Sequence, residues 1–181
     1  MVLADNTVKL RHCHNLSHDA SIKHFMKTII LYATKYGASG EAARRIAEKI
    51  DGAVACNLKQ DSIPPLDGFD CIIFGSSLYA GMIRREAKAF LSKNSACLQG
   101  KKLGLFLCGL GADGADGFFK KNFPAELLQA AKAKGFFGGI FDPKKTGALE
   151  RLILRIVTKQ SAYMNTISDR RIEQFVNDMK A

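Results

Sequence analysis

Hydrophobic residues after position 25 gather in short runs, and longer amphipathic segments separate these runs. Residues 28–33 (TIILYA) form an apolar, β-rich run before a Thr/Gly/Ser cluster, which is typical of a buried strand. Residues 39–50 then place Ala43, Ile46 and Ile50 at helical spacing. The same alternation continues, and it predicts strands at residues 28–33, 53–58, 71–74, 103–108 and 136–141, and helices at residues 39–50, 83–91, 148–159 and 169–180.

The remaining segments complete an α/β pattern. Pro124 suits the first turn of one more helix, of about 11 residues. Residues 61–68 and the glycine-rich stretch that ends at Asn122 are expected to be loops. Strands that are apolar on both faces and alternate with helices predict a parallel sheet with helices on both sides. We therefore expect an α/β fold with a three-layer, doubly wound sheet of five parallel strands, in one domain at residues 26–181.

Residues 1–25 are polar and aperiodic, and they hold all four histidines of the chain. One hypothesis is a metal site at His12, Cys13, His14 and His18. The other, which we favour, is a leader that is disordered or foreign to the native domain. A domain that starts at Met26 has no histidine, so we expect no metal site, no catalytic triad and no protein nucleophile.

Lysine and arginine number 27 against 17 aspartate and glutamate, which gives a net charge of +10. Such a surface favours anionic partners. The basic residues are spread along the chain without interleaved aromatics or a known module motif, so we expect no nucleic-acid binding. No apolar run reaches the ~18 residues of a membrane-spanning helix. Five scattered cysteines without a Cys-x-x-Cys pair favour a reducing, cytoplasmic location.

Two loops carry the candidate chemistry. Thr34–Gly40 joins the first strand to a helix N-terminus and offers hydroxyls, glycines and backbone amides, which suit one phosphate group. An ordinary turn, with Ser39 or Thr34 capping the helix, explains the same residues. The loop at residues 75–81 follows the third strand and carries Tyr79, a flat ring. Both loops would flank one crevice at the carboxyl edge of the sheet, which favours a flavin mononucleotide.

A G-x-G-x-x-G motif at residues 109–114 also follows a strand and is typical of dinucleotide sites. Asp142 stands where such a fold places its ribose-binding acid. However, Gly117 and Pro124 are expected to delay the helix, and two aspartates would repel a pyrophosphate. We therefore expect this loop to cover the flavin or to admit the substrate.

The segments TIILYATKYGAS and IIFGSSLYAG resemble the phosphate loop and the ring-contacting loop of flavodoxins. Residues 26–181 as a whole resemble the branch of flavodoxin-domain proteins that contains menaquinone-dependent protoporphyrinogen dehydrogenases. The resemblance implies strand order 2-1-3-4-5 and non-covalent FMN. It also implies phosphate contacts from Thr34, Tyr36, Gly37, Ala38, Ser39 and Gly40, and ring contacts from Ser76, Ser77, Leu78, Tyr79 and Gly81 on one side and Cys108, Gly109, Leu110 and Gly111 on the other.

The implied activity is that of an FMN-dependent oxidoreductase that oxidises protoporphyrinogen and passes the electrons to a quinone. A non-catalytic flavodoxin that carries electrons between redox partners is the alternative. Since electron carriers of this kind tend to be acidic and this chain is basic, we favour the enzyme.

Residues 148–159 carry an apolar stripe on one helical face and Arg151, Arg155 and Lys159 on another. An ordinary helix that packs on the sheet has the same pattern. The functional hypothesis is a docking face for an anionic membrane surface or an acidic redox partner, which would place the protein at the inner face of the membrane.

Overall fold

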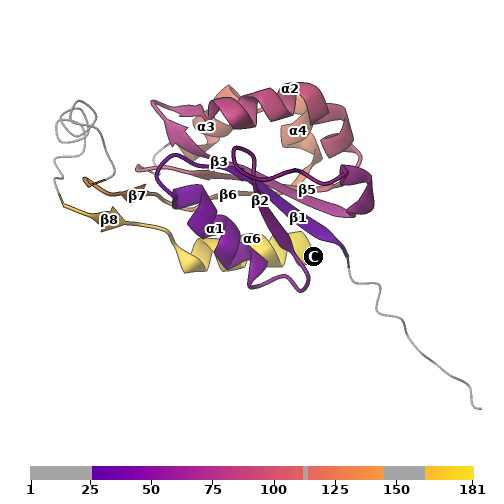
Figure 1. Ribbon diagram of the computed structural model, residues 1–181, viewed down its shortest axis with the longest axis horizontal. Helices are drawn as coiled ribbons and strands as arrows, with labels where there is room; N and C mark the ends of the chain where they lie inside the picture. The colour runs from indigo at the N-terminus through magenta and orange to yellow at the C-terminus, as the bar shows by residue number, and fades with distance from the viewer. Residues whose placement is uncertain (1–25, 112–113, 145–161) are drawn as a thin grey trace, which may run out of the picture.

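The computed structural model describes residues 26–111, 114–144 and 162–181 (Figure 1). Within these residues, five parallel strands lie in the order β2-β1-β3-β5-β6, and β4 pairs antiparallel with β3. A separate two-stranded sheet pairs β7 antiparallel with β8. The strands are β1 (Thr28–Ala33), β2 (Val54–Asn57), β3 (Cys71–Tyr79), β4 (Met82–Ile83), β5 (Lys102–Cys108), β6 (Ala131–Phe136), β7 (Ile140–Phe141) and β8 (Met164–Asn165).

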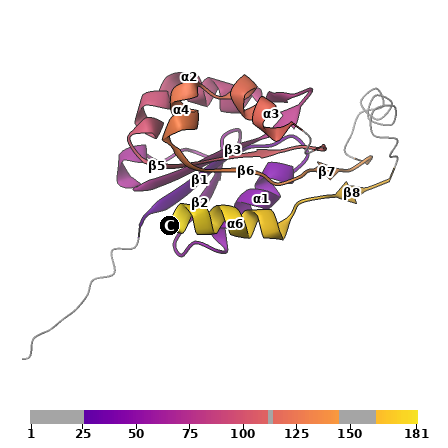
Figure 2. The same cartoon turned by 180° about the vertical axis from the view of Figure 1, so that it is seen from behind.

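Helices cover both faces of the sheet, as Figures 1 and 2 show. On one face lie α1 (Ala38–Ala47) and α6 (Asp169–Lys180). On the other lie α2 (Arg85–Gln99), α3 (Ala115–Asn122) and α4 (Ala125–Ala130). A short 3-10 helix, η1 (Leu66–Gly68), precedes β3. The predicted three-layer, doubly wound fold is confirmed. The predicted strand order is confirmed too, because β5 and β6 become the fourth and fifth strands when the parallel strands alone are numbered along the chain, which gives 2-1-3-4-5.

The core explains why the strands read as continuous apolar runs. Ile29 and Leu31 of β1 pack in the cluster beneath α2 and α4, whereas Ile30 packs in the cluster beneath α1 and α6. Successive strand residues point to opposite faces, so a sheet covered on both sides buries every position. The central strands lack the polar alternation of a half-exposed sheet for this reason.

The prediction was wrong for the last parallel strand, which is β6 at Ala131–Phe136 rather than residues 136–141. The helix expected from Pro124 ends at Ala130. The sequence AKAKGF is rich in alanine and lysine, which favour helices. In the structure its lysines are exposed along the edge of the sheet while Ala133 and Phe136 are buried. Edge strands often carry exposed lysine, and tertiary packing decided this segment against its helix propensity.

Other element boundaries also differ from the prediction. The glycine-rich stretch contains α3 at Ala115–Asn122, because Phe119 packs into the core beside α4. The third strand continues to Tyr79 and turns into β4, so residues 75–81 are mostly strand and hairpin rather than loop. In contrast, α6 spans the predicted residues 169–180, with the Ser168 hydroxyl accepting from the amide of Arg171 (3.3 Å).

Some predictions fall outside the described residues. These are the leader at residues 1–25, with its histidines, and the helix at residues 148–159, with Arg151, Arg155 and Lys159. Across the part of the chain that the structure describes, no helix is long and apolar enough to cross a membrane.

Candidate functional site

The carboxyl ends of β1, β3 and β5 meet at one edge of the sheet. Ala33, the last residue of β1, is in register with Ser76 of β3, and Ser76 is in register with Leu107 of β5. The loop after β1 and the hairpin after β3 therefore lie beside each other. In doubly wound sheets, ligands bind in the crevice outside this edge.

The side chain of Thr34 closes the loop between β1 and α1 with a hydrogen bond. The amide of Gly37 donates to Oγ1 of Thr34 (3.0 Å), and Gly37 has a left-handed φ of 96°. Gly37 is the N-cap of α1, and no side chain caps the helix. Thr34 thus closes the turn before the helix, as the ordinary-turn explanation expects, whereas Ser39 makes no capping hydrogen bond. The backbone N–H groups in the first turn of α1 have no partner within the helix, so an anion could accept hydrogen bonds from them.

Ser39 is fully buried in the first turn of α1, and its Oγ finds no hydrogen-bond partner. The thiol of Cys108 at the end of β5 lies close to it without forming a hydrogen bond of normal geometry. Burial raises the pKa of Cys108 to about 12, and the Ser39 hydroxyl opposes that rise. A buried hydroxyl without a partner costs about 1–3 kcal/mol, and such groups call for an explanation. A bound phosphate would supply the missing acceptor.

The end of this loop packs closely against β1. A side chain on Gly40 would come within 3.2 Å of the ring of Tyr32, so Gly40 keeps α1 close to β1. Burial raises the pKa of Tyr32, and the nearby Asp61 adds to that rise. Around Gly37, in contrast, a Cβ would meet nothing within 4 Å. The loop therefore packs firmly at its base and stays open at Gly37, where a phosphate would approach.

The β3–β4 hairpin holds the predicted ring-contacting residues. The Oγ of Ser76 accepts from the amide of Arg84 (3.0 Å) and donates to the carbonyl of Ser77 (3.1 Å), which fixes the hairpin internally. Ser77 is buried and its Oγ has no hydrogen-bond partner. Ala80 and Gly81 form the turn with φ of 50° and 74°. The hydroxyl of Ser76 therefore forms internal hydrogen bonds of the hairpin. Ser77 carries a second buried hydroxyl, to which a ligand could supply the missing hydrogen bond.

Tyr79 is 44% exposed, and cations lie against its ring. Nζ of Lys35, from the loop after β1, lies 4.2 Å from the ring centroid, and Cζ of Arg84 lies 5.8 Å away. Lys35 also lies over Tyr36, at 4.9 Å. Lys35 thus connects the phosphate loop to the hairpin. Sequence reasoning missed Lys35 and Arg84, although the position of Lys35 between Thr34 and Tyr36 was a signal of its proximity.

The segment after β5 lies on the far side of the hairpin. The amide of Gly109 donates to the carbonyl of Gly138 (2.9 Å). A Cβ on Gly109 would meet Phe136 at 3.3 Å and Leu78 at 3.5 Å. Gly109 therefore fills the narrow space between the end of β3 and the turn after β6. The side chain of Cys108 is buried beneath this segment, so only its backbone is near the crevice.

The glycine motif at residues 109–114 does lead into a helix, since α3 begins at Ala115 immediately after Gly114. The predicted delay was wrong. The acid required by a dinucleotide site is misplaced, however, because Asp142 follows β7, which pairs with β8 outside the parallel sheet. Asp116 in the first turn of α3 also opposes an anion. These positions disfavour a dinucleotide at this helix.

The fold and this edge define an α/β protein whose first strand leads through a glycine-containing loop into a helix N-terminus without a side-chain cap. Residues 29–168 match the flavodoxin domain family, and the chain belongs to that family. No match is found among curated proteins.

Solved structures share the fold at low sequence identity. A short-chain flavodoxin associated with a non-canonical PDU bacterial microcompartment is 16% identical, with a TM-score of 0.52 over 86% of this chain and 97% of its own. Oxidised flavodoxin 1 from Bacillus cereus is 14% identical, with a TM-score of 0.50 over 85% and 95%. Rubredoxin oxygen:oxidoreductase from Desulfovibrio gigas is 15% identical, with a TM-score of 0.51 over 85% of this chain. This chain spans only 34% of that larger protein.

Proposed function

We propose that the protein binds FMN at the carboxyl edge of its sheet and acts as an FMN-dependent oxidoreductase. The observation that carries the proposal is the buried, unpartnered Ser39 hydroxyl beside the uncapped N-terminus of α1, in a member of the flavodoxin domain family. These donors suit a terminal phosphate. When bound, FMN supplies the electron or hydride-equivalent transfer, and the protein supplies binding, orientation and electrostatics.

The roles of the chain's own residues follow from their positions. Thr34 holds the loop in shape through Gly37, and the amides of α1 bind the phosphate. The β3–β4 hairpin and the segment after β5 border the space for the ring, with Tyr79 at its exposed rim. Lys35 and Arg84 bring positive charge to that rim.

For the reaction, we propose oxidation of protoporphyrinogen with a quinone as electron acceptor. The resemblance to the protoporphyrinogen dehydrogenase branch and the net charge of +10 support this choice. The alternative is a flavodoxin that carries electrons between partner proteins, and the family itself supports it. The absorption spectrum of the purified protein tests FMN binding. Anaerobic turnover with protoporphyrinogen and a menaquinone analogue then separates the two functions, since only the enzyme oxidises the porphyrinogen.

The charges at Tyr79 predict a property of the bound flavin. Replacing Lys35 or Arg84 with glutamine should lower the midpoint potential of bound FMN by tens of millivolts, because nearby cations favour the reduced, anionic flavin. A spectroelectrochemical titration measures the shift. Lys49→Gln, an exposed lysine just after the other end of α1, is the control and should leave the potential unchanged. An equal or higher potential in both site variants would contradict the prediction.

We further propose that Arg151, Arg155 and Lys159 dock the protein on an anionic membrane surface, near a membrane quinone. Reversing these three charges should weaken binding to anionic vesicles at low salt and leave the FMN content unchanged. Reversal of Lys49, Lys59 and Lys93, three exposed lysines elsewhere, controls for net charge. If the wild-type protein does not bind anionic vesicles at low salt, the membrane proposal fails. The alternative, a flavodoxin that carries electrons between partner proteins, then gains support.

A further inference from the structure

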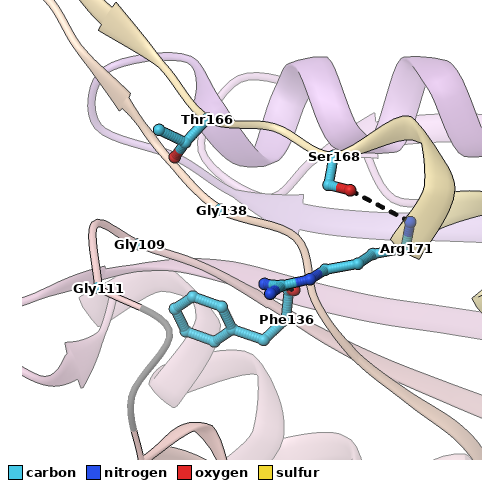
Figure 3. Close-up of a pocket in the computed structure, with 7 residues that line it drawn as sticks. All are labelled: Gly109, Gly111, Phe136, Gly138, Thr166, Ser168 and Arg171. Atoms are coloured by element: carbon cyan, nitrogen blue, oxygen red, sulfur yellow. Dashed lines mark hydrogen bonds between the residues drawn. The ribbon is translucent and has the colours of Figure 1, made fainter.

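A pocket of about 330 Å³ lies beside the candidate flavin site, at the same edge of the sheet (Figure 3). The segment after β5, the turn after β6 and the start of α6 enclose it. Its lining residues are Gly109, Gly111, Phe136, Gly138, Thr166, Ser168 and Arg171. The proposed function uses only the two glycines of the β5 segment, so the remainder of the pocket is unassigned.

Arg171 supplies the positive charge in the lining of this pocket, and its backbone lies in α6. Its amide donates to Oγ of Ser168 (3.3 Å), and its Nη1 donates to the carbonyl of Phe136 (3.2 Å). Figure 3 shows the guanidinium reaching from α6 to Phe136, below Gly138. A guanidinium has five N–H donors, so one backbone carbonyl leaves most of them available.

No carboxylate of the described residues pairs with Arg171. Of the three acids of α6, Asp169 and Asp178 bond other residues, and the exposed Glu173 forms no ion pair in the part of the chain that the structure describes. Asp169 bonds Arg45 of α1 at 2.9 Å, and Asp178 accepts from Gln174 at 2.8 Å. Arg171, an exposed residue, therefore presents a positive charge to the pocket with no carboxylate partner among the described residues. An arginine in this state suits a carboxylate, which it can bind with two parallel hydrogen bonds.

The two hydroxyls that line the pocket already accept backbone hydrogen bonds, that of Ser168 from the amide of Arg171. The hydroxyl of Thr166 is occupied by Gly139, whose amide donates to it at 3.0 Å. Phe136 contributes a flat apolar wall, and a second groove of about 320 Å³ continues past Phe136 and Arg171, where Lys134 and Asp178 also line it. In the first pocket Arg171 is the one charged lining residue, and one charged group beside an aromatic wall is typical of a site for an apolar acid.

The pocket and the candidate flavin site share one wall. Gly109 lies between Leu78 of the β3–β4 hairpin and Phe136 of the pocket, and a Cβ there would be 3.5 Å and 3.3 Å from them. A molecule anchored at Arg171 can therefore extend across the Gly109–Gly111 segment toward the space for the flavin ring.

We infer that the Arg171 pocket recognises a carboxylate of the substrate, and that the substrate is a carboxylic acid with a large apolar body. The inference rests on the proposed function and deepens it. Protoporphyrinogen, with two propionate groups on a large ring, belongs to this class. Arg171 is then a specificity-determining residue that anchors the substrate while its apolar part faces the flavin.

The test uses the FMN-loaded protein with two matched pairs of probes. The first pair is protoporphyrin IX and its dimethyl ester, which lacks the carboxylates. The second pair is 2-naphthoate and 2-naphthamide. Fluorescence titrations give the four affinities for the wild-type protein, Arg171→Gln and Arg170→Gln. Arg170 is a good control because it neighbours Arg171 on α6 and does not line the pocket.

We expect the wild-type protein to prefer each acid to its neutral partner by about tenfold or more, as for a hydrogen bond to a charged group. Arg171→Gln should remove this preference, and Arg170→Gln should keep it. Arg171→Lys should restore part of it. Unchanged FMN content and thermal midpoint in Arg171→Gln show that folding is intact.

Equal affinity for acid and neutral partner in the wild-type protein, or a preference that survives Arg171→Gln, would overturn the inference. FMN binding and reduction by dithionite are read separately, so the proposed function can stand when the inference fails. A retained preference for 2-naphthoate with no porphyrin binding keeps the carboxylate pocket and rejects the tetrapyrrole.

Discussion

Replacing Ser39 with alanine should lower the affinity for FMN by about 1–3 kcal/mol, the worth of a hydrogen bond to a charged group. The Ser39 hydroxyl is buried without a hydrogen-bond partner and has the thiol of Cys108 nearby, so a phosphate oxygen would give it a stronger acceptor. The same substitution should leave the apoprotein as stable as the wild type or slightly more stable, because it removes an unsatisfied buried group. Quenching of FMN fluorescence measures the affinity, and urea denaturation measures the stability.

Thr34→Ala should behave differently, because its Oγ1 already accepts from the amide of Gly37. We expect weaker FMN binding together with a less stable apoprotein, since the loop loses its internal bond. Ser92→Ala on the exposed face of α2 is the matched control and should change neither quantity. Unchanged FMN affinity in Ser39→Ala, or tight binding of FAD with none of FMN, would contradict a site for one terminal phosphate at this loop.

The sequence was most informative where local pattern and tertiary packing agree. The run TIILYA is β-rich and lies at the centre of the sheet, and α6 has a capping serine and a clear apolar stripe. Both elements were predicted with their observed bounds. The sequence AKAKGF shows the opposite case, because its helix propensity conflicts with its place at the edge of the sheet. Only the pairing with β5 decides it.

The candidate site was predictable in its parts and not in its contacts. The loop after β1 was recognisable from Thr34, Gly37 and Ser39, since a strand, a glycine turn and a helix N-terminus follow directly in sequence. The contact between Lys35 and Tyr79 was not, because it depends on β3 continuing to its hairpin. Arg171 was missed for a similar reason. Nothing in its local sequence shows that α6 begins beside the end of β5.

Gly75→Ala should destabilise the protein by about 3 kcal/mol, the upper end of the usual cost of overpacking a core. The sequence suggested a loop glycine at this position, but Gly75 lies inside β3, where the ring of Phe106 crosses it. A Cβ would lie 2.2 Å from that ring. Phe106 is fully buried and stacks on Phe137, with ring centroids 5.5 Å apart. The ring therefore has little room to retreat.

Urea denaturation should show a lower midpoint for Gly75→Ala with an unchanged m-value, which reports a loss of stability without a change of denatured state. Gly117→Ala is the matched control, because Gly117 is exposed within α3 and has open space around it. That change should stabilise the protein by about 0.5–1 kcal/mol, since alanine favours a helix over glycine. Adding Phe106→Leu to Gly75→Ala should cost less than the sum of the two single changes, because the smaller side chain makes room for the Cβ. Strict additivity, or wild-type stability in Gly75→Ala, would mean that Phe106 does not lie across Gly75. The effect should also reach the Arg171 pocket, since Phe137 packs edge-on against Phe175 of α6, the helix that carries Arg171.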